Sequence, residues 1–199
     1  MKPHPLKLLF CMVFFSLAAC TSLQPPRALP SSDGLQPVAS ETGSALRASG
    51  HWQWASIEVD EVLWQAGTEV ESEEQQQLCS VLRESLRRDL SPLAQGSGAK
   101  LRIRAQIVDV ATVSPALNLA TAVLIFLPVE RGGAAVLIEA LDAESGRGIA
   151  RFSMAESGGL SDFSGHFSRY GHAEQVLKRA ALAFRKILEQ ENDASRHQS

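Results

Sequence analysis

The sequence of 199 residues contains 19 lysines and arginines against 22 aspartates and glutamates, which gives a formal net charge of −3 at pH 7. This mildly acidic balance argues against a nucleic-acid-binding surface. Once the N-terminal segments described below are set aside, about 150 residues remain, enough for one domain with a hydrophobic core and too few for two ordinary ones.

Residues 1–19 have the layout of a secretory signal peptide, because two lysines precede the apolar run of residues 8–17 and two alanines follow it. The tetrapeptide L-A-A-C that ends at Cys20 resembles the bacterial lipobox, whose cysteine is diacylated and becomes the new N-terminus after cleavage. The alternative is an ordinary secretory signal followed by an incidental cysteine. We predict that Cys20 carries a lipid anchor, which makes a transmembrane helix unnecessary.

The residue after this cysteine bears on the destination of the protein. Thr21 stands where an aspartate would resemble the retention signal of the inner membrane, so we expect the anchor in the inner leaflet of the outer membrane, with the protein facing the periplasm.

Removal of residues 1–19, which contain two lysines and no acidic residue, changes the net charge from −3 to −5. Cys11 leaves with the signal peptide, so Cys79 has no partner for an internal disulfide and is expected to be a small buried residue, with pairing to another chain as the alternative.

Residues 20–50 are predicted to be the lipidated cysteine and a flexible tether. Proline, serine, alanine and glycine dominate residues 21–50, and no apolar period of 2 or 3.6 is visible. A coil of that length has a root-mean-square span of about 30 Å. We therefore expect the folded domain to begin at residue 51 and to be separated from the bilayer surface by the tether.

The first predicted elements of the domain are a strand and a helix. Residues 52–64 (WQWASIEVDEVLW) are rich in aromatic and β-branched residues and predict a strand, in which Trp52 and Trp54 are either part of the core or an aromatic surface for a partner or sugar. Residues 72–75 (SEEQ) fit a capping box, and Ser91-Pro92 ends the helix that follows. Its apolar stripe consists of Leu78, Val81, Leu82, Leu86 and Leu90.

Three further strands and a second helix follow. Residues 101–107 alternate between apolar and polar side chains, as in a strand with one wet face. Residues 135–141 and 149–155 predict a hairpin around the turn sequence DAESGRG. Residues 173–188 carry a long apolar stripe, while Lys178, Arg179, Arg185 and Lys186 are predicted to face water, with a lipid-headgroup patch as the alternative.

This order of elements predicts an α+β fold. We expect a two-layer sandwich in which a mainly antiparallel sheet of about four strands is covered by two long amphipathic helices, with one short apolar segment besides. The periplasmic domain is predicted to span residues 51–190, and residues 191–199 form a polar tail.

The short apolar segment is the part of residues 114–133 between Pro115 and Pro128. At about a dozen residues it cannot span a hydrocarbon core as a lone helix, which needs about twenty residues. Both a helix and, over residues 121–126, a strand are compatible with its composition. It is either buried in its own domain or exposed to a lipid or protein partner. The candidate residues for such a surface are Leu119, Val123, Leu124, Phe126, Trp52 and Trp54.

Three short stretches resemble a known family. Residues 114–118 (SPALN), residues 126–128 (FLP) with 131–133 (RGG), and residues 167–173 (FSRYGHA) are similar to signatures of an uncharacterised bacterial lipoprotein family called domain of unknown function 3313. The resemblance extends over residues 52–188, and Tyr170 stands where the family pattern suggests a tryptophan. It implies an envelope location and an intact domain, without an activity.

The sequence contains no G-x-S-x-G elbow, H-E-x-x-H motif, phosphate-binding loop or C-x-x-C pair. Residues 161–166 (SDFSGH) and His172 include the side-chain types of a catalytic triad, but such residues normally converge from separate parts of a fold. His166 and His172 lack an evident third ligand for a metal. The alternative is that residues 158–171 pack against the sheet and that His172 caps the last helix.

These observations predict a non-enzymatic lipoprotein of the outer membrane that needs no cofactor or metal. We expect its periplasmic domain to act as a binding or assembly accessory for an envelope component, most simply a protein, and to bind no nucleic acid. The alternatives are a small hydrophobic-ligand or lipid-binding module and an unrecognised hydrolase.

Overall fold

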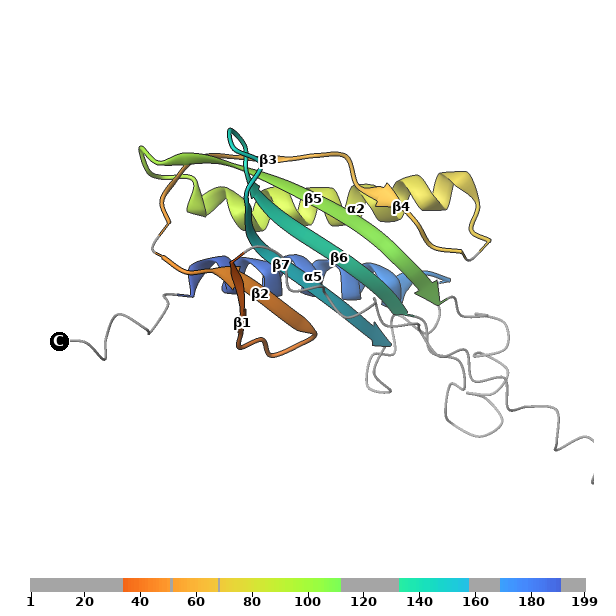
Figure 1. The fold of residues 1–199 in the computed structure, drawn as a ribbon. Helices are drawn as coiled ribbons and strands as arrows, with labels where there is room; N and C mark the ends of the chain where they lie inside the picture. The colour runs from red at the N-terminus through yellow and green to blue at the C-terminus, as the bar shows by residue number, and fades with distance from the viewer. Residues whose placement is uncertain (1–33, 51, 68, 112–132, 158–168, 191–199) are drawn as a thin grey trace, which may run out of the picture.

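The computed structural model describes residues 34–50, 52–67, 69–111, 133–157 and 169–190, which form a seven-stranded sheet with two long helices on one of its faces (Figure 1). The predicted α+β class is confirmed, whereas the prediction of about four strands was wrong. In chain order the elements are β1 (Leu35–Val38), β2 (Ser44–Ala48), β3 (Trp54–Val59), β4 (Leu63–Trp64), α2 (Ser72–Leu90), the 3-10 helix η2 (Ser91–Leu93), β5 (Ala99–Ala111), β6 (Gly133–Asp142), β7 (Gly148–Ser157) and α5 (Gly171–Glu189).

The sheet is mixed. Its strand order is β1-β2-β7-β6-β5-β3, and β4 also pairs with β5. β3 and β4 run parallel to β5, whereas the other neighbouring strands are antiparallel. The parallel pairing follows from the connection, because the chain passes from β4 through α2 before it enters β5, and such a crossover returns it in the same direction.

The predicted boundary of the tether at residue 50 was wrong, because β1 and β2 form a hairpin at one edge of the sheet and β2 pairs with β7. The turn between them contains Gly43 at φ +73°, where a Cβ atom would lie 2.1 Å from the carbonyl oxygen of Ser153, so only glycine fits there. The hairpin was missed because Pro37 usually argues against a strand and because Arg47 occupies an inward position.

Arg47 is 3% exposed and its Nη1 donates a hydrogen bond to the carbonyl oxygen of Gln190, the C-cap residue of α5. A basic group is favourable at the end of a helix where unpaired carbonyls gather. Burial lowers the pKa of this guanidinium from its ordinary value. The contact fastens the N-terminal hairpin to the last helix.

β5, β6 and β7 form the centre of the sheet and carry its buried face. The predicted alternation in β5 is confirmed, because Leu101, Ile103, Ala105 and Ile107 are at most 2% exposed while Arg102 and Arg104 are exposed. In the register, Ala105 lies opposite Ile138, and Ile138 lies opposite Phe152. Apolar side chains of the three strands thus form one continuous layer beneath the helices.

The hairpin predicted around residues 142–148 is confirmed. The carboxylate of Asp142 accepts hydrogen bonds from the backbone N–H groups of Ser145 and Glu144 and from the Ser145 hydroxyl. These bonds, those from Ser145 above all, lower the pKa of Asp142. Gly146 completes the turn at φ +71°, a conformation that other residues rarely adopt.

Helix α2 forms as the apolar stripe predicts, with Leu78, Leu82, Leu86 and Leu90 at most 1% exposed. The predicted capping box was wrong. The N-cap is Glu71, one residue earlier, without a side-chain cap hydrogen bond, and the Gln75 side chain donates instead to the carbonyl oxygen of Val70 at 2.7 Å. Glu73 and Glu74 in the first turn and Arg87 in the last still complement the helix dipole.

Helix α5 also buries its predicted stripe, which includes Val176, Leu177, Ala180, Ala181, Phe184, Ile187 and Leu188. Phe184 is fully buried and packs against Phe152 of β7, with ring centroids 6.4 Å apart. His172 does not cap this helix, because the N-cap is Tyr170 and no side-chain cap hydrogen bond forms. His172 is instead buried, with 1% of its surface exposed.

The two helices lie side by side and point in the same direction (Figure 1). At their N-terminal ends, the Tyr170 hydroxyl donates to the Glu74 carboxylate at 2.9 Å, and Arg169 lies 3.6 Å from both Glu71 and Glu74. One turn further, Gln77 donates to Glu174 at 2.9 Å. Burial and the Glu74 carboxylate raise the pKa of Tyr170 to about 12. A polar junction therefore aligns the beginnings of the two helices.

Replacement of Phe184 tests the layer between the helices and the sheet. Because the ring is fully buried, Phe184→Ala should lower the free energy of unfolding by about 3 to 5 kcal/mol, measured by urea or thermal unfolding. Leu182→Ala on the same helix is the control, since Leu182 is 47% exposed and its loss should change stability little. Equal effects of both variants would contradict the assigned faces of α5.

Replacement of Tyr170 tests the helix junction. Tyr170→Phe keeps the ring and removes the hydrogen bond to Glu74, so the free energy of unfolding at pH 7 should fall by about 0.5 to 1.5 kcal/mol. Because the pKa of Tyr170 in the folded protein, about 12, exceeds the ordinary tyrosine value of about 10, the contribution of the hydroxyl to stability is fully present below pH 10 and is lost as the pH rises toward 12. The stability gap between wild type and variant should therefore narrow over this range. A difference in stability between wild type and Tyr170→Phe that does not change with pH would contradict the hydrogen bond between Tyr170 and Glu74.

Candidate functional site

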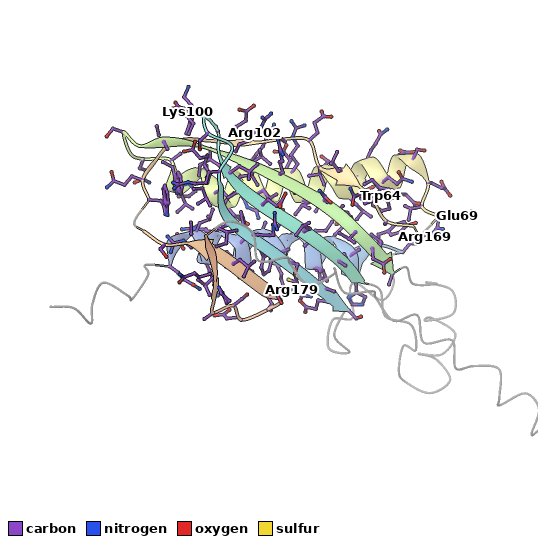
Figure 2. All side chains as sticks on the ribbon, viewed as in Figure 1. Trp64, Glu69, Lys100, Arg102, Arg169 and Arg179 are labelled. Atoms are coloured by element: carbon purple, nitrogen blue, oxygen red, sulfur yellow. The ribbon has the colours of Figure 1, made fainter. Side chains whose placement is uncertain are left out.

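Two segments that carry the sequence motifs leave the sheet at the same end. Ala111, the last residue of β5, pairs with Gly133, the first of β6, and Gly133 pairs with Ser157, the last of β7. Residues 112–132 and 158–168 therefore begin at adjacent strand ends. The residues described after the second segment begin at Arg169. Figure 2 shows Arg169 at this end of the molecule, beside the start of α2.

Most of the predicted surface residues and the predicted anchor lie outside the described residues. These are Cys20, Leu119, Val123, Leu124 and Phe126. The structure fixes where the segment with the four apolar candidates is inserted, at the paired ends of β5 and β6. Its helix or strand character and its burial stay predictions.

The two tryptophan candidates form an aromatic stack. The rings of Trp52 and Trp54 lie 5.7 Å apart and nearly parallel, and the guanidinium of Arg147 in the β6–β7 turn lies 5.0 Å from the Trp52 ring centroid. Trp54 is 4% exposed and Trp52 is half-buried. The burial of Trp54 argues against its predicted place on a partner surface, because the ring is already covered by the core and by Trp52.

The possible catalytic triad and metal ligands lie only partly within the described residues. Residues 161–166 lie outside the described ranges, so the local triad stays untested, and His172 is buried at the start of α5. Within the described residues, no three His, Cys, Asp or Glu side chains are grouped in a way that could hold a metal ion.

The face of the sheet opposite the helices carries ion pairs between neighbouring strands, and these pairs were not predicted from the sequence. Arg102 and Arg104 of β5 lie 3.0 and 3.7 Å from Asp60, and Arg151 of β7 lies 2.6 Å from Glu139 of β6 (Figure 2 labels Arg102). The Asp60 carboxylate raises the pKa of Arg102. The pair of Glu139 and Arg151 could have been found, because a hairpin centred on Ser145 places these residues opposite each other.

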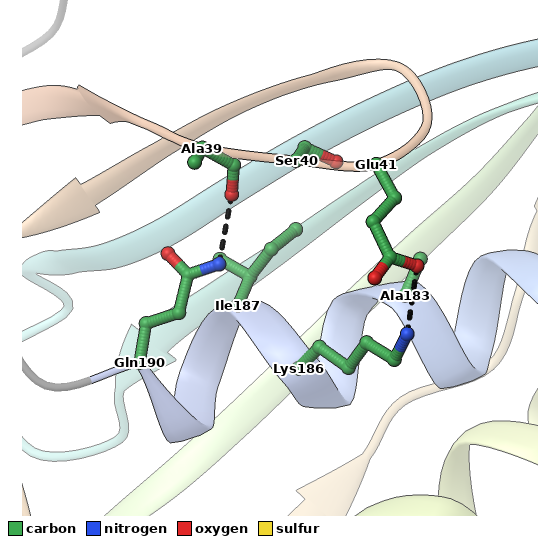
Figure 3. Close-up of a pocket in the computed structure, with 7 residues that line it drawn as sticks. All are labelled: Ala39, Ser40, Glu41, Ala183, Lys186, Ile187 and Gln190. Carbon is green, nitrogen blue, oxygen red and sulfur yellow. Dashed lines mark hydrogen bonds and ion pairs between the residues drawn. The ribbon is translucent and has the colours of Figure 1, made fainter.

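A hollow of about 340 Å³ lies between the β1–β2 turn and α5 (Figure 3). Ala183 and Ile187 form part of its lining. Two contacts cross it, because Lys186 lies 2.7 Å from the Glu41 carboxylate and the Gln190 side chain donates to the Ala39 carbonyl at 2.8 Å. These contacts hold the turn against the helix, so the hollow is a seam between two packed elements. The sequence interpretation missed it because it assigned residues 39–41 to the tether.

Cys79 is the one free cysteine within the described part of the chain, and it is half-buried on α2 beside the core. Burial raises the pKa of its thiol, which disfavours the reactive thiolate. The sequence predicts a small buried residue here, and the structure places Cys79 at the border of the core, where it is half-buried. No helix within the described ranges combines the length and the apolar character needed to cross a membrane.

Comparison with solved structures finds distant likenesses. The PelC dodecamer from Paraburkholderia phytofirmans is similar at 10% identity and a TM-score of 0.45, with 75% of this chain and 99% of that chain covered. Protein XCC0632 from Xanthomonas campestris is similar at 11% identity and a TM-score of 0.37, with coverage of 67% and 84%. At these identities and scores the likenesses transfer no function to this chain.

No curated protein matches the chain. The family model described as protein of unknown function (DUF3313) matches residues 26–184, which include all seven strands, α2 and most of α5. The match begins before β1, in agreement with a folded unit that starts earlier than residue 51. Because the match covers most of the sequence, the chain belongs to the DUF3313 family.

Proposed function

We propose that this protein is a lipoprotein anchored to the periplasmic face of the outer membrane, where its domain acts as a non-enzymatic binding or assembly accessory for an envelope component. The proposed partner is a protein, and the proposed contact is made by the apolar segment between β5 and β6. The family match supports the integrity of the domain and names no activity.

The anchor part of the proposal rests on the sequence L-A-A-C at residues 17–20 and on the position of the first strand. The described domain begins its first strand at Leu35, so 14 residues separate it from Cys20. A flexible chain of that length has a root-mean-square span of about 20 Å. A domain held on such a chain would stay close to the bilayer surface and be free to meet partners in the periplasm or on the membrane.

The observation that carries the binding part is the pairing of Ala111 with Gly133. These residues are adjacent across one rung of the ladder, so residues 112–132 are an insertion that leaves and re-enters the sheet at one point. This insertion holds the most apolar run of the chain after the signal peptide. An apolar insertion at one end of a sheet is a suitable position for contact with another protein, because exposed apolar surface marks interaction sites.

The anchor is tested by Cys20→Ser. The variant should be released from the membrane fraction with the fold of its domain intact, because the lipid is the proposed attachment and 14 residues separate Cys20 from the first described strand. Cell fractionation with a high-salt wash measures the attachment, and circular dichroism of the released protein measures the fold. A serine variant that still sediments with outer membranes would show that another part of the protein holds it there.

The partner surface is tested by Leu124→Asp. If Leu124 contacts a partner, the purified variant should melt at nearly the temperature of the wild type and should lose its partner in a pull-down after chemical cross-linking of intact cells. The matched control is Leu182→Asp, which introduces the same charge at an exposed position on α5 and should retain the partner. Unfolding of Leu124→Asp would contradict the proposal, since a charge buried in the core destabilises by several kcal/mol.

A further inference from the structure

The edge of the sheet formed by β3 has one strand neighbour within the described residues, which is β5. The backbone N–H of Asp60, just after β3, donates to the carbonyl oxygen of Ile103 on β5 at 2.9 Å. Because the amide groups of successive residues in a strand point to alternate sides, those of Ile57 and Val59 point away from β5. Within the described ranges neither residue has a backbone hydrogen bond on that side, so the edge offers donors and acceptors to a further strand.

A hollow of about 390 Å³ accompanies this edge, between β3 and the end of α2. Its lining residues are Ala55, Ser56, Ile57, Val59, Arg87, Ser91 and Ala94. Val59 is 5% exposed and Ile57 is half-buried, so the floor under the edge is apolar. At one end the Gly96 N–H donates to the Trp54 carbonyl at 3.0 Å, so the loop before β5 covers the edge there, and within the described residues the stretch from Ala55 to Val59 has no further strand beside it.

Arg87 supplies the charge of this hollow. Its side chain is 46% exposed and lies 3.0 Å from Glu84, which is 64% exposed. Because an exposed ion pair contributes little to stability, Arg87 can exchange this partner for another carboxylate at little cost. The opposite edge of the sheet differs, because β1 contains Pro37, which lacks an N–H group and disfavours a further strand.

We propose that the free edge of β3 binds an extended segment of a partner protein as an additional strand. The segment places small apolar side chains at alternate positions over Ile57 and Val59, and an acidic side chain beside Arg87. Backbone hydrogen bonds supply the affinity of such strand addition, and the hollow and the arginine select the sequence. The proposed site consists of described residues of β3, the end of α2 and the stretch that follows it, and it does not include residues 112–132.

Hydrogen exchange measured by NMR on the full mature chain in detergent tests the site. In the free protein the amide of Glu58, which faces β5, should exchange slowly, while those of Ile57 and Val59 exchange fast. The probe is a short peptide of alternating valine and threonine with one aspartate. Its addition should protect Ile57 and Val59, and the same peptide with lysine in place of aspartate should bind more weakly by about threefold to fivefold.

Variants of the protein and of the peptide test which groups make the contacts, namely Arg87 and the backbone of β3. Arg87→Gln should weaken binding of the aspartate peptide by about threefold to fivefold, whereas Arg88→Gln, which also loses an exposed ion pair but lies outside the hollow, should leave it unchanged. Ile57→Pro should weaken binding about tenfold, because it removes one backbone donor of the edge. Should that variant not fold, N-methylation of the peptide amides that face β3 must cause the same loss, with methylation of the opposite edge as its control.

Three outcomes would overturn the proposal. The first is fast exchange of Ile57 and Val59 at millimolar concentrations of both peptides. The second is equal weakening by Arg87→Gln and Arg88→Gln. The third is protection of Ile57 and Val59 without peptide that increases with protein concentration, which would show that a second copy of the chain covers the edge.

Discussion

The apolar layer between the two helices and β5, β6 and β7 is the constraint on which the rest of the structure depends. Leu82 of α2, Phe184 of α5, and Ile138 and Phe152 of the sheet are fully buried in one core cluster, in which the rings of Phe184 and Phe152 contact each other. Burial of apolar surface is the largest favourable contribution to folding, and these side chains concentrate it in one layer. The parallel helices and the register of the three central strands are the arrangement that brings these stripes together.

This arrangement decides which surfaces are left for function. The helices pack their apolar faces on the sheet, and the opposite face of the sheet carries ion pairs such as that of Arg151 with Glu139. Two features of the described part of the chain are proposed here as contact sites. One is the end of the sheet at Ala111 and Gly133, where the apolar insertion begins. The other is the free edge of β3, whose backbone groups and hollow suit an extended chain.

The elements with strong periodicity could be predicted from the sequence. Four leucines of α2 recur at spacings of four residues, and apolar and polar side chains alternate regularly in the first half of β5. The residues that these patterns place on the inner face are the ones that are buried. The β1–β2 hairpin could not be predicted in this way, because Pro37 and the inward Arg47 contradict the pattern of a strand. Arg47 is accommodated only by the end of α5, a contact between residues 143 positions apart. The predicted capping box was wrong for a local reason, since the Gln75 side chain bonds to the Val70 carbonyl five residues earlier instead of closing the box.

The candidate site was only partly predictable. The sequence identifies an apolar segment between two prolines and a pair of tryptophans, but it does not show which strands they join. The parallel pairing of β3 with β5 places β3 at an edge, and this depends on the crossover through α2 rather than on any residue of β3 itself. Trp54 illustrates the limit of composition, because an aromatic residue in a strand suits a partner surface and a core equally well until its burial is known.

Photo-cross-linking in living cells is the most direct test of the proposed contact between a protein partner and the insertion that joins β5 and β6. A photoreactive amino acid is placed at Phe126 in one strain and at the exposed Leu182 of α5 in another. If the insertion contacts a partner as proposed, position 126 should give a discrete cross-linked envelope protein and position 182 should give none. Absence of a cross-link from position 126 in a folded, membrane-bound protein, or the same products from both positions, would contradict it.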